Sequence, residues 1–121
     1  MKQQFINSTS EQIRYTESKI ESNKEKLSED FIYYLSWNAK DIYTDSIRVK
    51  EYKRWLTRLE EVSDFGYFLH SELEAYDDYL SSEYHVCIES TNAVSELCVT
   101  WKYQVLVELR KHLKSWLRQS K

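Results

Sequence analysis

The chain has 121 residues and a formal net charge of −3, with 41% hydrophobic and 31% charged residues. This length is typical of one folded domain with a modest core. The sequence contains no proline and a single glycine, so the residues that usually interrupt helices are nearly missing, and we predict an all-α fold. It has no signal-peptide pattern and no apolar run of membrane-spanning length, so we expect a cytoplasmic protein without a membrane partner.

A first helix is predicted to begin after a short tail. Residues 1–7 are expected to be flexible, and Ser8 followed by Glu11 matches the capping box of a helix start. We expect this helix to end near Trp37. Its last stretch, residues 31–37, is apolar nearly all round, which predicts deep burial.

The first half of this helix carries a sparse apolar stripe. Large aliphatic residues recur at every seventh position, at Ile6, Ile13, Ile20 and Leu27. Such a stripe buries little surface by itself, so this half either packs at the rim of a bundle or contacts a partner. We take Ile13, Ile20 and Leu27 as candidate partner-binding residues.

Two more long helices are predicted after connections at residues 38–46 and 81–92. The middle helix, within residues 45–84, has apolar residues at steps of three and four, which places them on one face. Gly66 lies inside it and predicts a kink or break at residues 63–66. The last helix is expected over residues 93–118. The predicted fold is a single domain, residues 1–121, built as an antiparallel bundle of three long helices. A break near Gly66 would make it a four-helix bundle instead.

Charge is unevenly distributed along the sequence. Between Arg58 and Lys102 there is no Lys or Arg, whereas ten of the twenty acidic residues lie there. In the predicted antiparallel bundle, acidic and basic groups would gather at opposite ends and could guide partners, although solvated faces would look the same. Candidate contacts at the basic, Trp-containing end are Lys50, Arg54, Arg58, Lys111, Lys114 and Arg118. Candidate contacts at the acidic, Tyr-containing end are Glu72, Asp77, Asp78, Tyr76 and Tyr79.

No residue pattern indicates catalysis, a bound metal or a cofactor. His70 with Glu74, and Glu108 with His112, form i, i+4 pairs, but a di-metal bundle requires Glu-x-x-His twice, and that spacing is absent. The two cysteines lack the paired spacing of a zinc site. One glycine cannot supply a phosphate-binding loop.

These observations predict a non-enzymatic protein–protein interaction module, such as an adaptor, an inhibitor, a chaperone-like factor or a small subunit of a complex. A homodimer is expected, because the sparse stripe and the ten tyrosines exceed what one small core can cover. The alternative is a nucleic-acid-associated protein that uses the basic end. A metal-binding helical bundle is a third possibility.

Overall fold

The computed structural model describes the backbone of residues 1–89 and 93–120, and the side chains of residues 1–82 and 96–120. In this part of the chain there are four α-helices: α1 (Lys2–Glu29), α2 (Phe31–Glu61), α3 (Phe65–Glu89) and α4 (Ala93–Gln119). The all-α prediction is confirmed for these residues. The prediction of three long helices is wrong, and the four-helix alternative gives the correct count.

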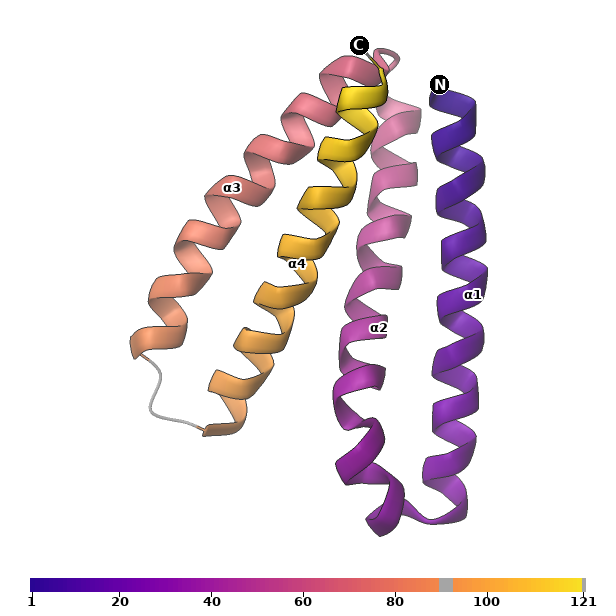
Figure 1. Ribbon diagram of the computed structural model, residues 1–121, viewed down its shortest axis with the longest axis vertical. Coiled ribbons are helices and arrows are strands. Elements are labelled where there is room, and N and C mark those ends of the chain that lie inside the picture. Colours follow the sequence, from indigo (N-terminus) through magenta and orange to yellow (C-terminus); the bar gives the residue numbers. More distant parts are fainter. Residues whose placement is uncertain (90–92, 121) are drawn as a thin grey trace.

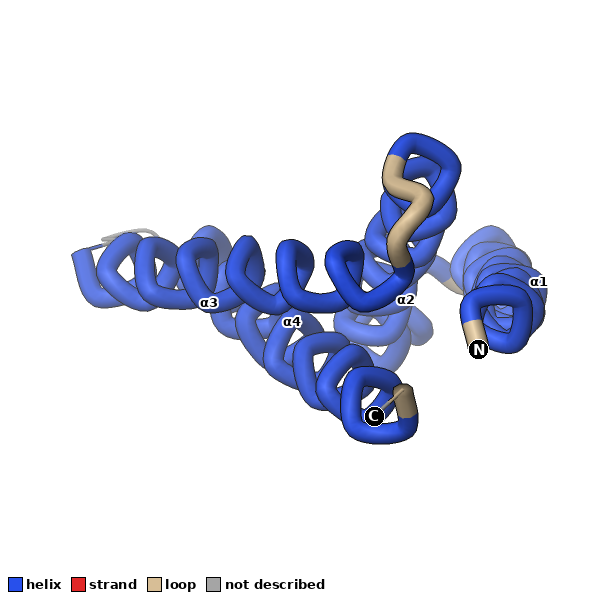
Figure 2. The backbone as a smooth tube through the Cα atoms, turned by 90° about the horizontal axis from the view of Figure 1, so that it is seen from above, coloured by secondary structure: helices blue, strands red, loops and turns tan. Residues whose placement is uncertain are grey.

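The helices form two antiparallel hairpins, α1–α2 and α3–α4 (Figure 1). The hairpins meet where α1 begins and α4 ends, and we call this the core end. From there the α3–α4 hairpin leads away from α2, as Figure 2 shows from above. With 31 residues, α2 is about 46 Å long at 1.5 Å per residue. The far end of the α1–α2 hairpin therefore projects well beyond the region where all four helices pack.

A single residue, Asp30, separates α1 from α2. Its backbone is extended, with φ −150° and ψ 90°, and its Oδ1 accepts a hydrogen bond of 3.0 Å from the backbone N–H of Tyr33. This is the geometry of a helix N-cap, which satisfies a donor that the new helix leaves free. The predicted first helix, which ran through this point to Trp37, is therefore wrong.

The predicted connection at residues 38–46 is also wrong, because these residues lie inside α2. The polar side chains that suggested it bond back to the preceding helical turn. Thr44 donates to the carbonyl of Asp41 at 3.3 Å, and Ser46 donates to that of Ile42 at 2.7 Å. Ser and Thr can satisfy their hydroxyls in this way without ending a helix.

The break predicted near Gly66 is confirmed, although its cause differs. Residues 62–64 are not helical, and Asp64 caps α3 by accepting a hydrogen bond of 2.9 Å from the N–H of Tyr67. Gly66 lies inside the first turn of α3 without a positive φ. A Cβ at this position would lie 3.3 Å from Asp64 Oδ1. The glycine therefore leaves room for the carboxylate that caps α3, while α2 has already ended at Glu61 with Val62 as its C-cap.

The N-terminal residues form part of the core, so the predicted flexible tail is wrong. They begin α1, and Ser8 lies inside that helix rather than at its start. Phe5 is 0% exposed and touches aromatic rings from each of the other three helices. Its ring centroid lies 5.8 Å from that of Trp55 in α2, 5.7 Å from Phe68 in α3 and 5.3 Å from Trp116 in α4. Phe5 thus fixes the start of α1 at the core end.

The sparse stripe of α1 packs against α2. Ile13 packs against the core, and Ile20 and Leu27 are half-buried. Between the aliphatic positions lie Thr9 and Thr16, both of which are buried. Together they complete a seam with steps of three and four, as in a coiled coil. The stripe looked sparse only because two of its buried positions are threonines, and α2 supplies the partner surface within the same chain.

Replacing Phe5 with Ala tests the role of this ring. We expect the free energy of unfolding to fall by about 3–5 kcal/mol, because a fully buried ring is removed from a site where four helices meet. Tyr15, which is 63% exposed on the same helix, is the control. Its replacement with Ala is expected to change stability by no more than about 0.5 kcal/mol in urea titrations. Equal losses for both variants would contradict the assignment.

His112 makes the stability of the core end depend on pH. Burial lowers the pKa of its imidazole, which stacks on Trp55 at 6.2 Å. Its Nε2 accepts a hydrogen bond of 3.2 Å from Trp116 Nε1, which requires a neutral acceptor nitrogen.

The folded pKa of His112 thus lies below its unfolded value of about 6.5, so the unfolded chain binds the proton more tightly. We expect stability to decrease as the pH falls through about 6.5, as measured by urea titration over the range of about pH 5–8. His112→Gln is expected to flatten this slope, whereas His70→Gln, at an exposed position, should preserve it. A slope unaffected by His112→Gln would exclude His112 as its source.

Candidate functional site

A buried ion-pair network joins α2 to α3. Glu72, which is 2% exposed, accepts a hydrogen bond of 3.1 Å from Arg54 Nη1. Its second oxygen lies 2.8 Å from Arg54 Nη2, an ion-pair distance without hydrogen-bond geometry. Arg54 also donates to Glu51 at 3.0 Å, and Arg58 approaches Glu72 to 3.7 Å. The carboxylate of Glu72 is therefore compensated by two guanidinium groups, as a buried charge requires.

Tyr76 connects this network to the aromatic core. Its hydroxyl donates to Glu51 at 2.9 Å and accepts a hydrogen bond of 2.9 Å from the buried indole N–H of Trp55. Burial and the charge of Glu51 raise the pKa of Tyr76 well above its usual value, so the hydroxyl stays protonated and serves as a donor. Glu72 and Tyr76, two of the predicted partner-binding residues, are both buried, and the contacts described here are with other residues of the same chain.

A second network joins three helices. Asp45 of α2 is 1% exposed, and its Oδ1 accepts a hydrogen bond of 2.8 Å from Arg48 Nη1. The other oxygen of Asp45 lies 3.4 Å from Lys19 Nζ of α1. Arg48 also donates to Glu108 of α4 at 2.8 Å. One buried carboxylate thus sets the positions of α1, α2 and α4 relative to one another.

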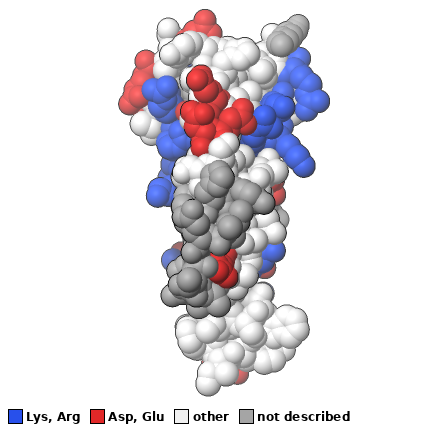
Figure 3. Space-filling view, turned by 90° about the vertical axis from the view of Figure 1, so that its left-hand side faces the viewer, with Lys and Arg blue, Asp and Glu red and all other residues white. Residues whose placement is uncertain are grey.

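The predicted separation of charge into an acidic and a basic end is wrong. Arg54 and Arg58 lie beside Glu72, and Arg110 of α4 pairs with Asp77 of α3. The reason is the turn at residues 62–64, which folds the basic part of α2 against the acidic part of α3. On the face shown in Figure 3, blue and red side chains lie next to one another towards the core end.

Several predicted contact residues remain on the surface. Among the described side chains, the exposed members of the two predicted sets are Lys50, Lys111, Lys114, Arg118, Asp77 and Asp78. Tyr79 is half-buried, and Lys102 Nζ lies 4.5 Å from the centre of its ring. Their predicted contact with a partner stays a prediction.

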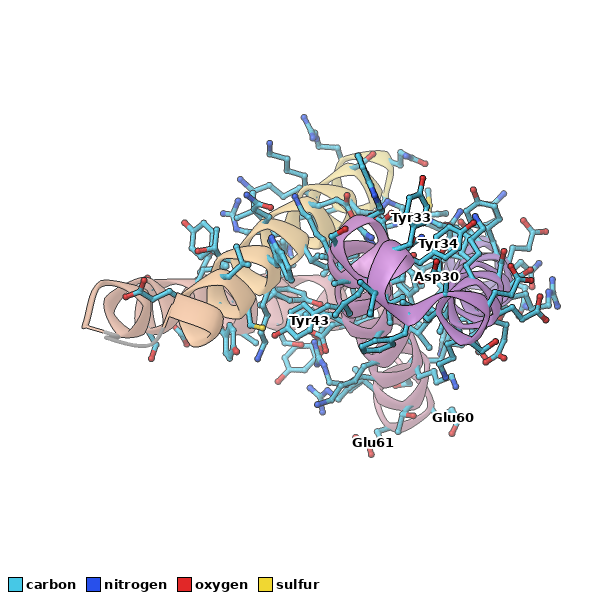
Figure 4. The ribbon with its side chains drawn as sticks, turned by 90° about the horizontal axis from the view of Figure 1, so that it is seen from below. Asp30, Tyr33, Tyr34, Tyr43, Glu60 and Glu61 are labelled. Atoms are coloured by element: carbon cyan, nitrogen blue, oxygen red, sulfur yellow. The ribbon has the colours of Figure 1, made fainter. Side chains whose placement is uncertain are left out.

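An open groove lies where the α3–α4 hairpin diverges from α2. Its volume is about 440 Å³. The apolar part of its lining comes from Ile47, Ala75 and Leu106, together with the rings of Tyr43, Tyr76 and Tyr79. The charged lining groups are Lys50, Arg54, Lys102 and Glu51, so three positive charges face one negative charge. Figure 4 shows Tyr43 between α2 and the α3–α4 hairpin, and its ring centroid lies 5.9 Å from that of Trp101.

The far end of the α1–α2 hairpin exposes a cluster of large apolar side chains. We call residues 31–37 the hairpin tip. Five of its seven residues are between 41% and 87% exposed: Phe31, Ile32, Tyr33, Leu35 and Trp37. The prediction that this segment is deeply buried is therefore wrong, because Asp30 turns the chain just before it and neither α3 nor α4 reaches that far. On the face shown in Figure 3, the lowest part of the molecule, where this hairpin ends, shows few charged side chains.

The tip is helical, and acidic residues directly precede it. It forms the first two turns of α2, which are held by the Asp30 cap and by a hydrogen bond of 2.9 Å between Asn38 and Asn23 of α1. Figure 4 shows Asp30, Tyr33 and Tyr34 at this end of the hairpin. In residues 28–38 the charged groups are Glu29 and Asp30, and there is no Lys or Arg. Sequence reasoning missed the tip as a surface, although an Asp directly before an apolar run is a recognisable N-cap signal.

The candidate metal ligands give no site in the described part of the chain. No group of three or more His, Cys, Asp or Glu side chains there is placed to hold a metal ion. His70 is exposed, and His112 is half-buried between aromatic rings. The side chains of His85 and Cys87 lie outside the described residues.

Comparison with known proteins gives no relative. No protein-family model, no curated protein and no solved structure matches the chain. Among the described residues, no helix combines the length and the apolar character needed to cross a membrane.

Replacing Tyr76 with Phe tests the polar link between the network and the core. We expect a loss of about 1–3 kcal/mol in the free energy of unfolding, because the buried indole N–H of Trp55 loses its acceptor. Tyr67→Phe, at a residue that is 62% exposed, is the matched control and should stay within about 0.5 kcal/mol of the unmodified chain in the same denaturant titration. A neutral Tyr76→Phe variant would show that Trp55 finds another acceptor.

Proposed function

We propose that this protein is a non-enzymatic protein–protein interaction module, and that the hairpin tip is its main contact surface. The observation that carries the proposal is the exposure of five large apolar side chains within seven consecutive residues. Single exposed apolar residues are ordinary on protein surfaces, whereas a contiguous cluster marks an interaction site.

The composition of the tip supports protein contact. Tyrosine, tryptophan and phenylalanine are enriched at the centres of interfaces, because they bury a large area at a small cost in conformational entropy. The tip supplies Trp37 at 72% exposure and Ile32 at 87% exposure on a preformed helix. Little ordering is therefore needed when a partner binds.

The charge around the tip favours a protein over a lipid surface. Proteins that lie on anionic membranes usually flank their apolar residues with Lys and Arg. Here the residues directly before the apolar cluster are Glu29 and Asp30, and the nearest basic residues on either side are single lysines, Lys26 and Lys40. Acidic groups beside aromatic rings suit a partner surface that is apolar and basic.

Nucleic-acid binding is the weaker candidate. Arg48, Arg54, Arg58 and Arg110 each form at least one ion pair with a carboxylate of the same chain. Those guanidinium groups would have to exchange partners before they could contact phosphates.

A photo-crosslinking amino acid at position 32 tests the proposal. We expect ultraviolet light to yield protein adducts from position 32 and none above background from position 15, which is also exposed, at 63%, but lies on the side of α1. Trp37→Asp in the same chain is expected to abolish the adducts, because it places a charge in the apolar contact. Thermal unfolding should remain unchanged, since Trp37 is 72% exposed.

Equal adduct yields from positions 15 and 32, or adducts that persist with Trp37→Asp, would refute the tip as the contact surface. The identity of the adduct, whether a second copy of this chain or another protein, does not affect this conclusion.

A further inference from the structure

The groove and the hairpin tip are complementary to each other. The groove is lined by tyrosine rings and aliphatic side chains, with the ammonium groups of Lys50 and Lys102 along it, whereas Arg54 in its wall is already paired with Glu51 and Glu72. The tip presents apolar and aromatic side chains directly preceded by Glu29 and Asp30, with Lys26 and Lys40 as the nearest basic residues on either side. Opposite charges around matching apolar surfaces are what specific contacts use to select a partner.

The dimensions of the groove suit the side chains of the tip. Its volume of about 440 Å³ lies within the range of about 300–1,000 Å³ for pockets that bury small organic molecules. An indole or phenyl ring therefore fits inside. Lys102 already lies over the ring of Tyr79, at 4.5 Å from its centre, which shows that this ammonium is placed for contact with aromatic faces.

The tip of one molecule cannot enter the groove of the same molecule. Tyr43 and Ile47, which form one wall of the groove, lie on the same continuous helix as the tip. A helix cannot fold back on itself within ten residues, so the two surfaces stay apart along α2. Any contact between them has to join two molecules.

We propose that the chain associates head to tail, with the hairpin tip of one copy seated in the groove of a second copy. This inference rests on the proposed function and names its partner. Each copy then offers one tip and one groove, so the contact is heterologous and repeats until a ring closes or a filament grows. The side chains that we assign to insertion are Ile32 and Trp37, with Lys50 and Lys102 facing Glu29 and Asp30.

A mixing experiment tests this arrangement, because it separates the two surfaces. The tip variant carries Ile32→Asp and Trp37→Asp, and the groove variant carries Lys50→Glu and Lys102→Glu. We expect the light-scattering mass of the unmodified chain to rise with concentration above 14.7 kDa, while each variant alone stays at 14.7 kDa. An equimolar mixture should reach twice that mass and no more, since it retains one intact tip and one intact groove per pair.

Two further variants make the result independent of folding defects. Ala75→Arg adds bulk to the exposed wall of the groove and keeps its positive charge, so it should block association by size alone. Tyr15→Asp with Tyr67→Asp alters two exposed tyrosines on other surfaces and should leave association intact. Thermal unfolding is measured for every variant, and we expect each to keep the transition of the unmodified chain.

Other outcomes overturn the proposal. An unmodified chain that stays at 14.7 kDa at every concentration excludes a second copy as the partner, whereas crosslinking at the tip would still support the proposed function. Association lost in the tip variant but kept in the groove and Ala75→Arg variants would indicate a symmetric tip-to-tip contact. Association kept in the tip variant removes the tip from self-association. A mixture of two monomeric variants that does not form a pair also refutes head-to-tail contact.

Discussion

The packing around Phe5 determines the shape of this protein. Its ring contacts Trp55, Phe68 and Trp116, and these residues come from the three other helices. Aromatic pairs at such distances gain energy beyond the area they bury. Because this cluster lies at one end of the molecule, all four helices are tied together there (Figure 1). Towards the other end the two hairpins are free to diverge.

Both candidate surfaces follow from this one-sided arrangement. The groove opens where the α3–α4 hairpin separates from α2, and the hairpin tip projects because α2 continues beyond that point. The buried carboxylate of Glu72 favours this arrangement, since Arg54 of α2 compensates it, and Asp45 adds a contact of 3.4 Å with Lys19 of α1 to its pair with Arg48 in the same helix. Because all four helices pack together at the core end only, the other end presents an apolar surface at the hairpin tip and a charged groove further along α2.

The helical character and the break near Gly66 could be predicted from the sequence, because both depend on local composition. The failed prediction of burial at residues 31–37 depended on a single capping residue. The chain turns at Asp30, whereas the sequence predicted this turn at residues 38–46, at least eight residues later. With the turn in the wrong place, positions at the start of α2 that are exposed were predicted to be buried. The charge pattern failed for a different reason: treating residues 45–84 as one helix placed Arg54 and Glu72 far apart, whereas the turn at residues 62–64 brings them together. The groove could not be predicted, because its lining comes from three helices whose divergence is set by packing at the core end.

The apolar character of the tip has no role in holding the described fold together. Ile32 and Trp37 are 87% and 72% exposed, so changing them to polar residues would remove little buried area from the chain. Exposed aromatic residues carry a cost, because they promote non-specific association. Residues 31–37 could form the same helix with polar side chains, since the Asp30 cap and the backbone hydrogen bonds do not depend on them. The fold therefore does not account for this cluster, and this is why we propose contact with another surface.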